Sequence, residues 1–392
     1  HCFRFFECFT SFTFFRMLFI TIQAAHKMEN STNGKNSNEL ALICNMTGTH
    51  TFISAFIPVV YSCNFVIGIV GNSMVVAVIH YYMKMKTVAN IFVLNLAVSD
   101  LTFLITLPMW ATVTAMGYHW PFGSFLCKAT AALVSFNLYT SVFFLTALSI
   151  DRYLAIVSPV ESRRYRTVRY AQMTCILVWT VSLLLSLPTA LTRSTIPIKG
   201  TNITVCAIPG DESDRWLVPL SLMKSVLGFV VPLVIILTCY CLIGRALQGP
   251  KCIQGSNRCH GDEVLYMLAA AVLAFFLCWA PHQVFNLMYL LLHLNVISDC
   301  HTLDVIDTAM PFTICIAYFN TCVNPILYGF VGKNFRRSLL RLLRCAEARP
   351  VASHPSLSTK MSTLSYRASD SLLLTAGKTS SLTRNEHCGV KK

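Results

Sequence analysis

Residues 88–114 read VANIFVLNLAVSDLTFLITLPMWATVT, and this stretch decides the class of fold. As a helix it can cross about 30 Å of hydrocarbon, and its only ionisable side chain is Asp100. Six further apolar runs are long enough to do the same. The expected spans are 52–80, 88–114, 124–157, 170–191, 216–243, 264–294 and 304–331. We therefore predict an all-α membrane protein, a seven-transmembrane helix bundle.

The composition excludes an ordinary soluble protein. Of the 392 residues, 55% are hydrophobic and only 12% are charged, whereas about a quarter of a globular chain is charged. The net charge of +14 would suit a nucleic-acid-binding protein, but most basic residues lie in short loops between the apolar runs. That placement is typical of a membrane protein, and no nucleic-acid partner is expected.

The loops also predict an orientation. Basic residues concentrate in the first, third and fifth connections and after the last span, while the opposite loops are mainly acidic. By the positive-inside rule the C-terminus is cytoplasmic and the N-terminus is extracellular. Three glycosylation sequons, at Asn30, Asn45 and Asn202, all fall on the outer side.

The spans and their loops occupy residues 52–331, and the rest of the chain differs from them in composition. Residues 1–27 mix many Phe with scattered charges. We expect them to be a non-native leader before a start at Met28, with a signal sequence as the alternative. Residues 28–51 are the expected extracellular N-terminus. Residues 346–392 are rich in Ser and Thr without apolar periodicity, which predicts a disordered cytoplasmic tail.

Residues 332–345, directly after the last span, predict a short amphipathic helix on the inner leaflet. Its apolar face holds Phe335, Leu339, Leu342 and Leu343, and its basic face holds Arg336, Arg337, Arg341 and Arg344. Cys345 lies where a palmitoyl group would enter the membrane.

Polar side chains at membrane depth are candidates for function, because placing them there costs several kcal/mol. Asp100, Asn137 and Ser141 lie at similar depths on two spans and offer oxygen ligands for a sodium ion. Buried hydrogen bonds between helices are the structural alternative. No cofactor other than this allosteric ion is expected.

Lys224 lies about two turns into the fifth span. It either snorkels outwards or faces a cavity and binds an anion. Arg193 stands at the outer end of the fourth span, and Asp304 and Asp307 stand at the outer end of the seventh. A mouth with charges of both signs suits a zwitterionic peptide.

Asp151-Arg152-Tyr153 ends the third span at the cytoplasmic face. The adjacent charges are either a solvated helix end or a switch, in which Arg152 moves between Asp151 and a partner from the cytosol. On the opposite, oxidising side, Cys127 with Cys206 and Cys44 with Cys300 are the expected disulfide pairs.

Three other classes of membrane protein fit less well. A transporter would show related halves and a channel would show pore-lining rings, and neither is visible in the sequence. An intramembrane protease needs two facing catalytic groups, but Asp100 has no second carboxylate in the core of any span. We therefore expect a protein that is not an enzyme.

The spans carry a set of short motifs: Gly71-Asn72, Leu96-Ala-Val-Ser-Asp100, Asp151-Arg152-Tyr153, Trp179, Phe275-x-x-x-Trp279-x-Pro281 and Asn324-Pro325-x-x-Tyr328. Together they resemble the rhodopsin-like G-protein-coupled receptors over residues 52–345. The resemblance implies a multi-pass plasma-membrane receptor that activates a heterotrimeric G protein.

Finer stretches point to one branch of that family: Tyr118-His-Trp-Pro-Phe-Gly, Ser135-Phe-Asn-Leu-Tyr139, Asn202-Ile-Thr-Val-Cys206 and Asp307-Thr-Ala-Met-Pro311. They are similar to the angiotensin receptors, and the tail stretch 357–366 favours the type 1 group over type 2. The implied ligand is the angiotensin II peptide, with a bradykinin-, apelin- or chemokine-like peptide as the alternative. The implied partners are a Gq-class G protein acting through phospholipase C and calcium, receptor kinases, arrestin and membrane lipid.

The resemblance also implies residue roles. The ligand's carboxylate would lie near Lys224 and Arg193, and its arginine near Asp307. The ligand-binding set is Tyr61, Trp110, Tyr118, Arg193, Lys224, Asp307, Met310, Ile314 and Tyr318. The activation switch is Asn137, Arg152, Tyr240, Trp279, Asn320, Asn324 and Tyr328.

The chain departs from the family pattern at three places. Tyr289 replaces an acidic residue near the outer end of the sixth span, and Val113 replaces a pocket tyrosine. Thr321 replaces an asparagine that, in the family, partners the equivalent of Asn137 in the resting state.

Overall fold

The computed structural model describes residues 50–347, with gaps at 84, 86, 165, 199, 249–258, 295, 298 and 299. Residues 1–27 and nearly all of 28–51 and 346–392, for which separate parts are expected, lie outside the described residues. Seven helical segments are long and apolar enough to cross a membrane: Phe52–Met83, Val88–Ala115, Gly123–Val157, Val168–Thr192, Arg215–Leu247, Val264–His293 and Cys300–Gly329. Each coincides with a predicted span to within a few residues, which confirms the seven-helix bundle.

Several spans consist of more than one element. The first is α3 (His50–Val78) with the π-helical segment η1 (Ile79–Met83), and the second is α4 (Val88–Leu104) with α5 (Leu107–Ala115). The third and fourth are α6 (Gly123–Val157) and α8 (Val168–Thr192). The fifth is α9 (Gly210–Ser225), the π-helical η2 (Val226–Val230) and α10 (Val231–Gln248). The sixth and seventh are α11 (Cys259–His293) and α12 (Cys300–Val331). The remaining elements are α7 (Pro159–Ser162), α13 (Lys333–Glu347), β1 (Ser194–Pro197) and β2 (Thr204–Ala207).

Local sequence explains where the helices begin and where they break. The hydroxyl of Thr87 accepts a hydrogen bond from the backbone N–H of Asn90 at 3.3 Å and so caps α4, and Thr167 caps α8 in the same way. Pro108 lies in the first turn of α5, where its missing N–H would be unpaired in any case. The second span therefore breaks between α4 and α5 and resumes at a proline.

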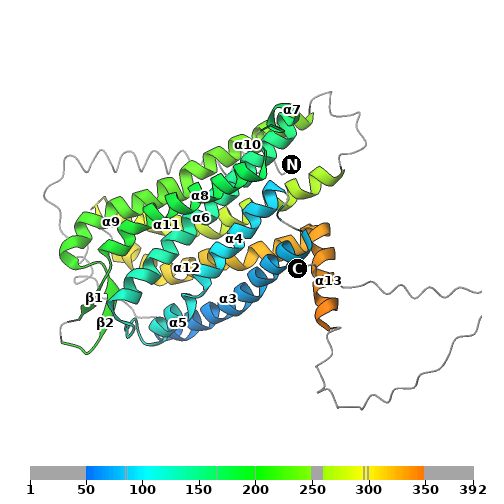
Figure 1. Ribbon diagram of the computed structural model, residues 1–392. Helices are drawn as coiled ribbons and strands as arrows, with labels where there is room; N and C mark the ends of the chain where they lie inside the picture. Colours follow the sequence, from blue (N-terminus) through cyan, green and yellow to red (C-terminus); the bar gives the residue numbers. More distant parts are fainter. Residues whose placement is uncertain are drawn as a thin grey trace, which may run out of the picture.

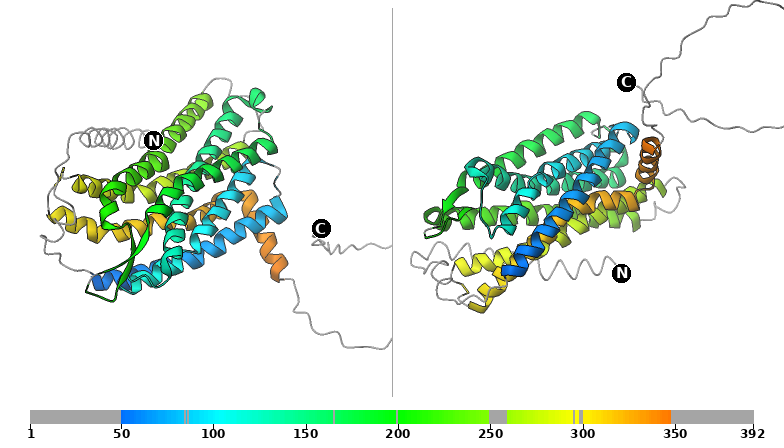
Figure 2. Two further views of the ribbon diagram at one scale, coloured as in Figure 1. Left: turned by 60° about the vertical axis from the view of Figure 1, so that its left-hand side comes forward. Right: turned by 90° about the horizontal axis from the view of Figure 1, so that it is seen from below.

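The third span is the centre of the bundle. In the most apolar 18-residue stretch of α6, 72% of the residues are buried. In the corresponding stretch of α8 only 28% are buried, because α8 lies on the outside of the bundle. Figures 1 and 2 show α6 between α4, α8 and α10, with α11 and α12 completing the ring. Gly71 of α3 faces Pro325 of α12 so closely that an added Cβ would lie 3.0 Å from the proline Cβ.

The two ends of the bundle carry different structures. At one end β1 and β2 form an antiparallel hairpin in which Thr195 pairs with Cys206. At the other end α13 lies across the bundle (Figure 1), and the ring of Phe335 stands 6.2 Å from that of Tyr328. The predicted amphipathic helix is therefore present, with Phe335 buried and Leu343 exposed.

Candidate functional site

A cavity of about 440 Å³ opens at the hairpin end of the bundle. Its walls come from α6, α8, α9, α11 and α12 and from Ile208, which follows β2. A volume of this size suits an organic ligand or the end of a peptide. The predicted ligand-binding residues that line it are Arg193, Lys224, Asp307, Met310, Ile314 and Tyr318, together with Trp279, which is predicted to belong to the activation switch.

Two cations face this cavity without an acidic partner. Lys224 comes from α9, and Arg193 follows the last residue of α8. Arg193 donates from Nη1 to the carbonyl oxygen of Cys206 at 3.2 Å, and burial lowers the pKa of its guanidinium group. Within the described part of the chain neither side chain pairs with a carboxylate, and their positive charges repel each other. An anionic group in this part of the cavity would therefore be stabilised by both cations.

The acidic group of the cavity stands at its mouth. Asp307 of α12 lines the cavity with an exposed side chain. Tyr118 lies near it, in a backbone conformation with φ of 67°, and its pKa is raised first by burial and then by the charge of Asp307. Positive charge inside and negative charge at the rim give the cavity a polarity along its axis.

Three predicted ligand-binding residues lie beside the cavity and not on its wall. Tyr61 is buried among aromatic side chains, with its ring 5.7 Å from that of Tyr318. The ring of Trp110 lies 5.6 Å from that of Trp120. Tyr118 is about half exposed at the rim. Tyr318 therefore connects the cavity with this neighbouring aromatic group.

The cavity wall also includes polar residues of α11 that the sequence analysis does not single out. His282, Gln283 and Asn286 follow Trp279 at helical spacing and so share its face. Gln283 accepts a hydrogen bond through Oε1 from the hydroxyl of Ser225 at 2.9 Å, which ties α9 to α11. These three residues could have been predicted from the sequence, because they are polar side chains within an apolar span, as Lys224 is.

A disulfide fixes the hairpin above the cavity. Cys127 at the start of α6 is bonded to Cys206 in β2, which confirms the first predicted pair. Cys300 is also disulfide-bonded, while its predicted partner Cys44 lies outside the described residues. The carbonyl oxygen of Cys206 also accepts the hydrogen bond from Arg193. The disulfide therefore helps to hold Arg193 at the cavity.

Below the cavity, Asp100 joins three helices. Asn137 donates from Nδ2 to Oδ1 of Asp100 at 3.0 Å, Ser141 donates to the same oxygen at 3.4 Å, and Asn324 donates from Nδ2 to Oδ2 at 3.2 Å. Asn137 thus presents nitrogen and not oxygen to the carboxylate. The side-chain oxygens of Asn320 and Asn324 have no partner among the described residues. At Asn137 the arrangement agrees with the structural alternative, a hydrogen bond between helices.

The structure places all three residues that depart from the family pattern. The hydroxyl of Thr321 donates to the carbonyl oxygen of Tyr318 on its own helix at 2.9 Å, while Asn137 is bonded to Asp100. Val113 is buried against the Cys127 bridge and Trp120. Tyr289 lines the cavity.

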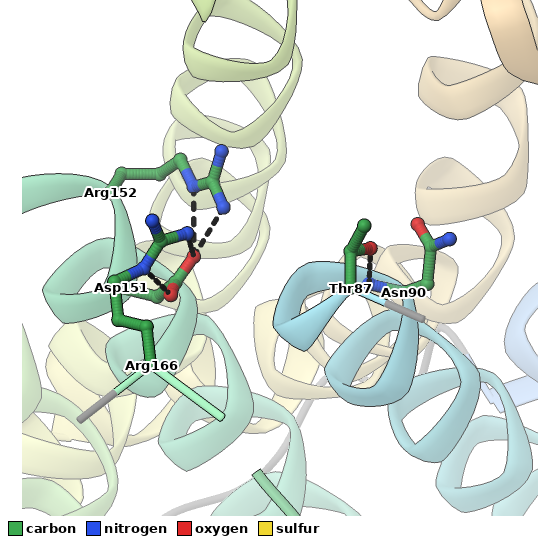
Figure 3. Close-up of polar contacts among 5 residues, drawn as sticks. All are labelled: Thr87, Asn90, Asp151, Arg152 and Arg166. Atoms are coloured by element: carbon green, nitrogen blue, oxygen red, sulfur yellow. Dashed lines mark hydrogen bonds and ion pairs between the residues drawn. The ribbon is translucent and has the colours of Figure 1, made fainter. Parts of the chain in front are cut away.

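At the end of α6 opposite the hairpin, the carboxylate of Asp151 binds two arginines. The Nε of Arg152 lies 3.1 Å from Oδ2, its Nη2 bonds to the same oxygen, and Arg166 binds the carboxylate as well (Figure 3). The Asp151 side chain is 2% exposed, so the motif is not a solvated helix end. The hydroxyl of Tyr240 is buried next to Ser149, and the buried hydroxyl of Tyr328 has no partner in the described part of the chain.

The expected modification sites are only partly described. Asn202 is exposed in the turn between β1 and β2. Asn30 and Asn45 lie outside the described residues. Cys345 lies near the end of helix α13, which follows α12 directly.

Residues 71–328 match the family described as 7 transmembrane receptor (rhodopsin family). The chain is 54% identical over 336 residues to the Type-1 angiotensin II receptor B of Mus musculus, an alignment that covers 86% of this chain and 93% of that receptor. It is 53% identical over 330 residues to the Type-1 angiotensin II receptor of Homo sapiens, covering 84% and 91% of the two chains.

These similarities extend across nearly the whole length of the relatives. The family model agrees with the seven membrane-spanning helices of the structure. The family consists of receptors, which confirms that the chain is not an enzyme. The chain belongs to the rhodopsin family of seven-transmembrane receptors, and its similarity within that family is to the type-1 angiotensin II receptors.

Proposed function

We propose that this chain is a plasma-membrane receptor for angiotensin II that promotes nucleotide exchange on a Gq-class G protein. Its N-terminus is extracellular and its C-terminus cytoplasmic. The positive-inside pattern supports this orientation, since Arg163, Arg164 and the arginines of α13 lie at the end of the bundle opposite the hairpin.

The observation that carries the proposal is that two cations line the cavity and neither pairs with a carboxylate among the described residues. Lys224 and Arg193 would hold the carboxylate of the peptide, and Asp307 at the mouth would receive its arginine. Two partly buried positive charges without a carboxylate to neutralise them are unfavourable in the ligand-free receptor, so a ligand that brings a carboxylate relieves an existing cost.

Activation would begin at the floor of the cavity. Trp279 and Tyr318 line it, and the ring of Trp279 lies 6.0 Å from that of Phe275 one turn further in. A ligand that displaces these rings would shift α11 against α6 and allow Arg152 to leave Asp151. Arg152 would then contact the G protein in the opened inner cleft.

The tail, Cys345 and the surroundings of Asp100 would each regulate the receptor. Phosphorylation of the tail by receptor kinases would add negative charge and recruit arrestin. A palmitoyl group on Cys345 would hold α13 to the lipid surface. A sodium ion near Asp100 would use the carboxylate, the Ser141 hydroxyl and the unpartnered oxygen of Asn324, and it would supply a positive charge beside the buried carboxylate.

The test is cytosolic calcium in cells that express residues 28–392 and are challenged with angiotensin II. We expect a calcium rise in the parent and a dose–response curve shifted at least tenfold to higher peptide concentration in Lys224→Ala, because a charge-assisted hydrogen bond contributes about 1.5–3 kcal/mol. Arg215→Ala is the matched control, because Arg215 lies on the same helix with an exposed side chain. Silence of the parent despite surface expression would refute the ligand, and related peptides would then be screened.

A further inference from the structure

Arg166 binds Asp151 with better geometry than Arg152 does. Its Nε lies 2.7 Å from Oδ1 and its Nη2 lies 3.2 Å from Oδ2, so it uses both carboxylate oxygens. Arg152 uses Oδ2 alone. A two-oxygen contact with guanidinium is the stronger arrangement. Figure 3 shows the two guanidinium groups converging on this one carboxylate.

The backbone around Arg166 is built to hold this position. The N–H of Arg166 donates to the carbonyl oxygen of Ser162 at 2.8 Å, which closes a turn after α7. The next residue, Thr167, caps α8. Arg166 is therefore fixed between two helices, and its side chain is 27% exposed, against 14% for Arg152.

The charges around the carboxylate are unbalanced, with two cations on one anion. If Arg152 were the only partner, its departure would leave a buried, unpaired carboxylate, which is strongly unfavourable. Arg166, which contacts both oxygens, would keep the carboxylate paired if Arg152 left. Arg166 would also weaken the attraction between Asp151 and Arg152 before release, because it already neutralises the carboxylate that both arginines share.

We propose that Arg166 is a positioning residue for activation: it keeps Asp151 paired and so lowers the free-energy cost of releasing Arg152. The inference rests on the proposed function only in that the released state is the one that activates a G protein. Arg166 thus favours the active state by stabilising the acid that Arg152 leaves behind.

The first measurement uses no peptide and no G protein. Nitroxide labels at two exposed tyrosines, Tyr170 on α8 and Tyr266 on α11, report the separation of the inner helix ends in the full-length receptor. We expect Arg166→Ala to reduce the population of the open state about tenfold, and Arg166→Lys to reduce it less. Arg163→Ala and Arg164→Ala are the matched controls, because both arginines lie exposed in the same loop, and they should leave the population unchanged.

A double-mutant cycle separates this role from direct contact with a partner. In Asp151→Asn, which has no carboxylate to stabilise, Arg166→Ala should have no further effect on the open population or on ligand-free nucleotide exchange. An equal loss in that background would overturn the proposal, and so would a rise in the open population in Arg166→Ala alone.

Thermal unfolding of each variant checks the fold. If Arg166→Ala does not fold, Arg166→Lys is compared in both backgrounds. A failure of nucleotide exchange in every variant counts against Gq coupling and leaves the label measurement decisive for Arg166.

Discussion

Asn137 on α6 donates its side-chain amide to the carboxylate of Asp100 on α4 across 3.0 Å. Both side chains are buried, and Asp100 also accepts a hydrogen bond from Asn324 on α12. The second, third and seventh spans are therefore tied at one carboxylate. Arg152 is bound to Asp151 in the same structure. Under the proposed route of activation, in which Arg152 leaves Asp151, this tie would belong to the resting arrangement.

Removing the amide should loosen the resting state. We expect Asn137→Ala to raise ligand-free G-protein exchange roughly tenfold, because a hydrogen bond to a charged group contributes about 1.5–3 kcal/mol. Thr321→Ala is the control, since the hydrogen bond that the Thr321 hydroxyl makes among the described residues lies within its own helix. An equal rise in Thr321→Ala would show that the Asn137 contact with Asp100 is not what holds the resting state.

The acid at the cavity mouth should recognise charge and not shape. Asp307→Asn is expected to weaken angiotensin II binding about fivefold, a modest change because Asp307 is exposed to solvent. A peptide with citrulline in place of arginine should bind the parent and Asp307→Asn equally well. Asp304→Asn, on the same helix end, provides the control in competition binding. Loss of citrulline-peptide binding in Asp307→Asn would contradict a pairing between Asp307 and the arginine.

The outer disulfide should contribute to stability and to binding together. It joins residues 79 apart, for which loop-closure entropy corresponds to about 4 kcal/mol. The double variant Cys127→Ala, Cys206→Ala should therefore unfold at a lower temperature and bind ligand more weakly, since Cys206 also anchors Arg193. Cys63→Ala, at an exposed free cysteine, should change neither property. Unchanged thermal unfolding of the double variant would refute this.

Close packing of the first and seventh spans should limit residue 71 to glycine. A Cβ at Gly71 would meet ring atoms of Pro325 at 3.0 and 3.1 Å, and a proline ring within a helix cannot rotate away. A Cβ at Gly329 would meet nothing within 4 Å. Both alanine variants gain the same helix propensity. Relative to Gly329→Ala, Gly71→Ala should be about 1–3 kcal/mol less stable in thermal unfolding. Equal stability would show that α3 and α12 can move apart freely.

The sequence by itself determined the number of spans, their approximate ends and the depth of the polar residues. A helix in hydrocarbon pairs its own backbone groups, so a run of apolar residues is enough to predict it without knowledge of its neighbours. The same local logic correctly predicts the amphipathic helix after the last span. The pairing of Cys127 with Cys206, 79 residues apart, was predicted from their expected location on the same, oxidising side of the membrane, and it is confirmed.

Only the tertiary structure decided which polar side chains share a space. Tyr61 and Trp110 face an aromatic group beside the cavity, while His282 and Gln283 line its wall. Arg166 looked like one more loop arginine in the sequence, yet it reaches a carboxylate 15 residues away. Such contacts depend on how helices rotate and pack against each other, and that is settled by the shapes of all the facing side chains together.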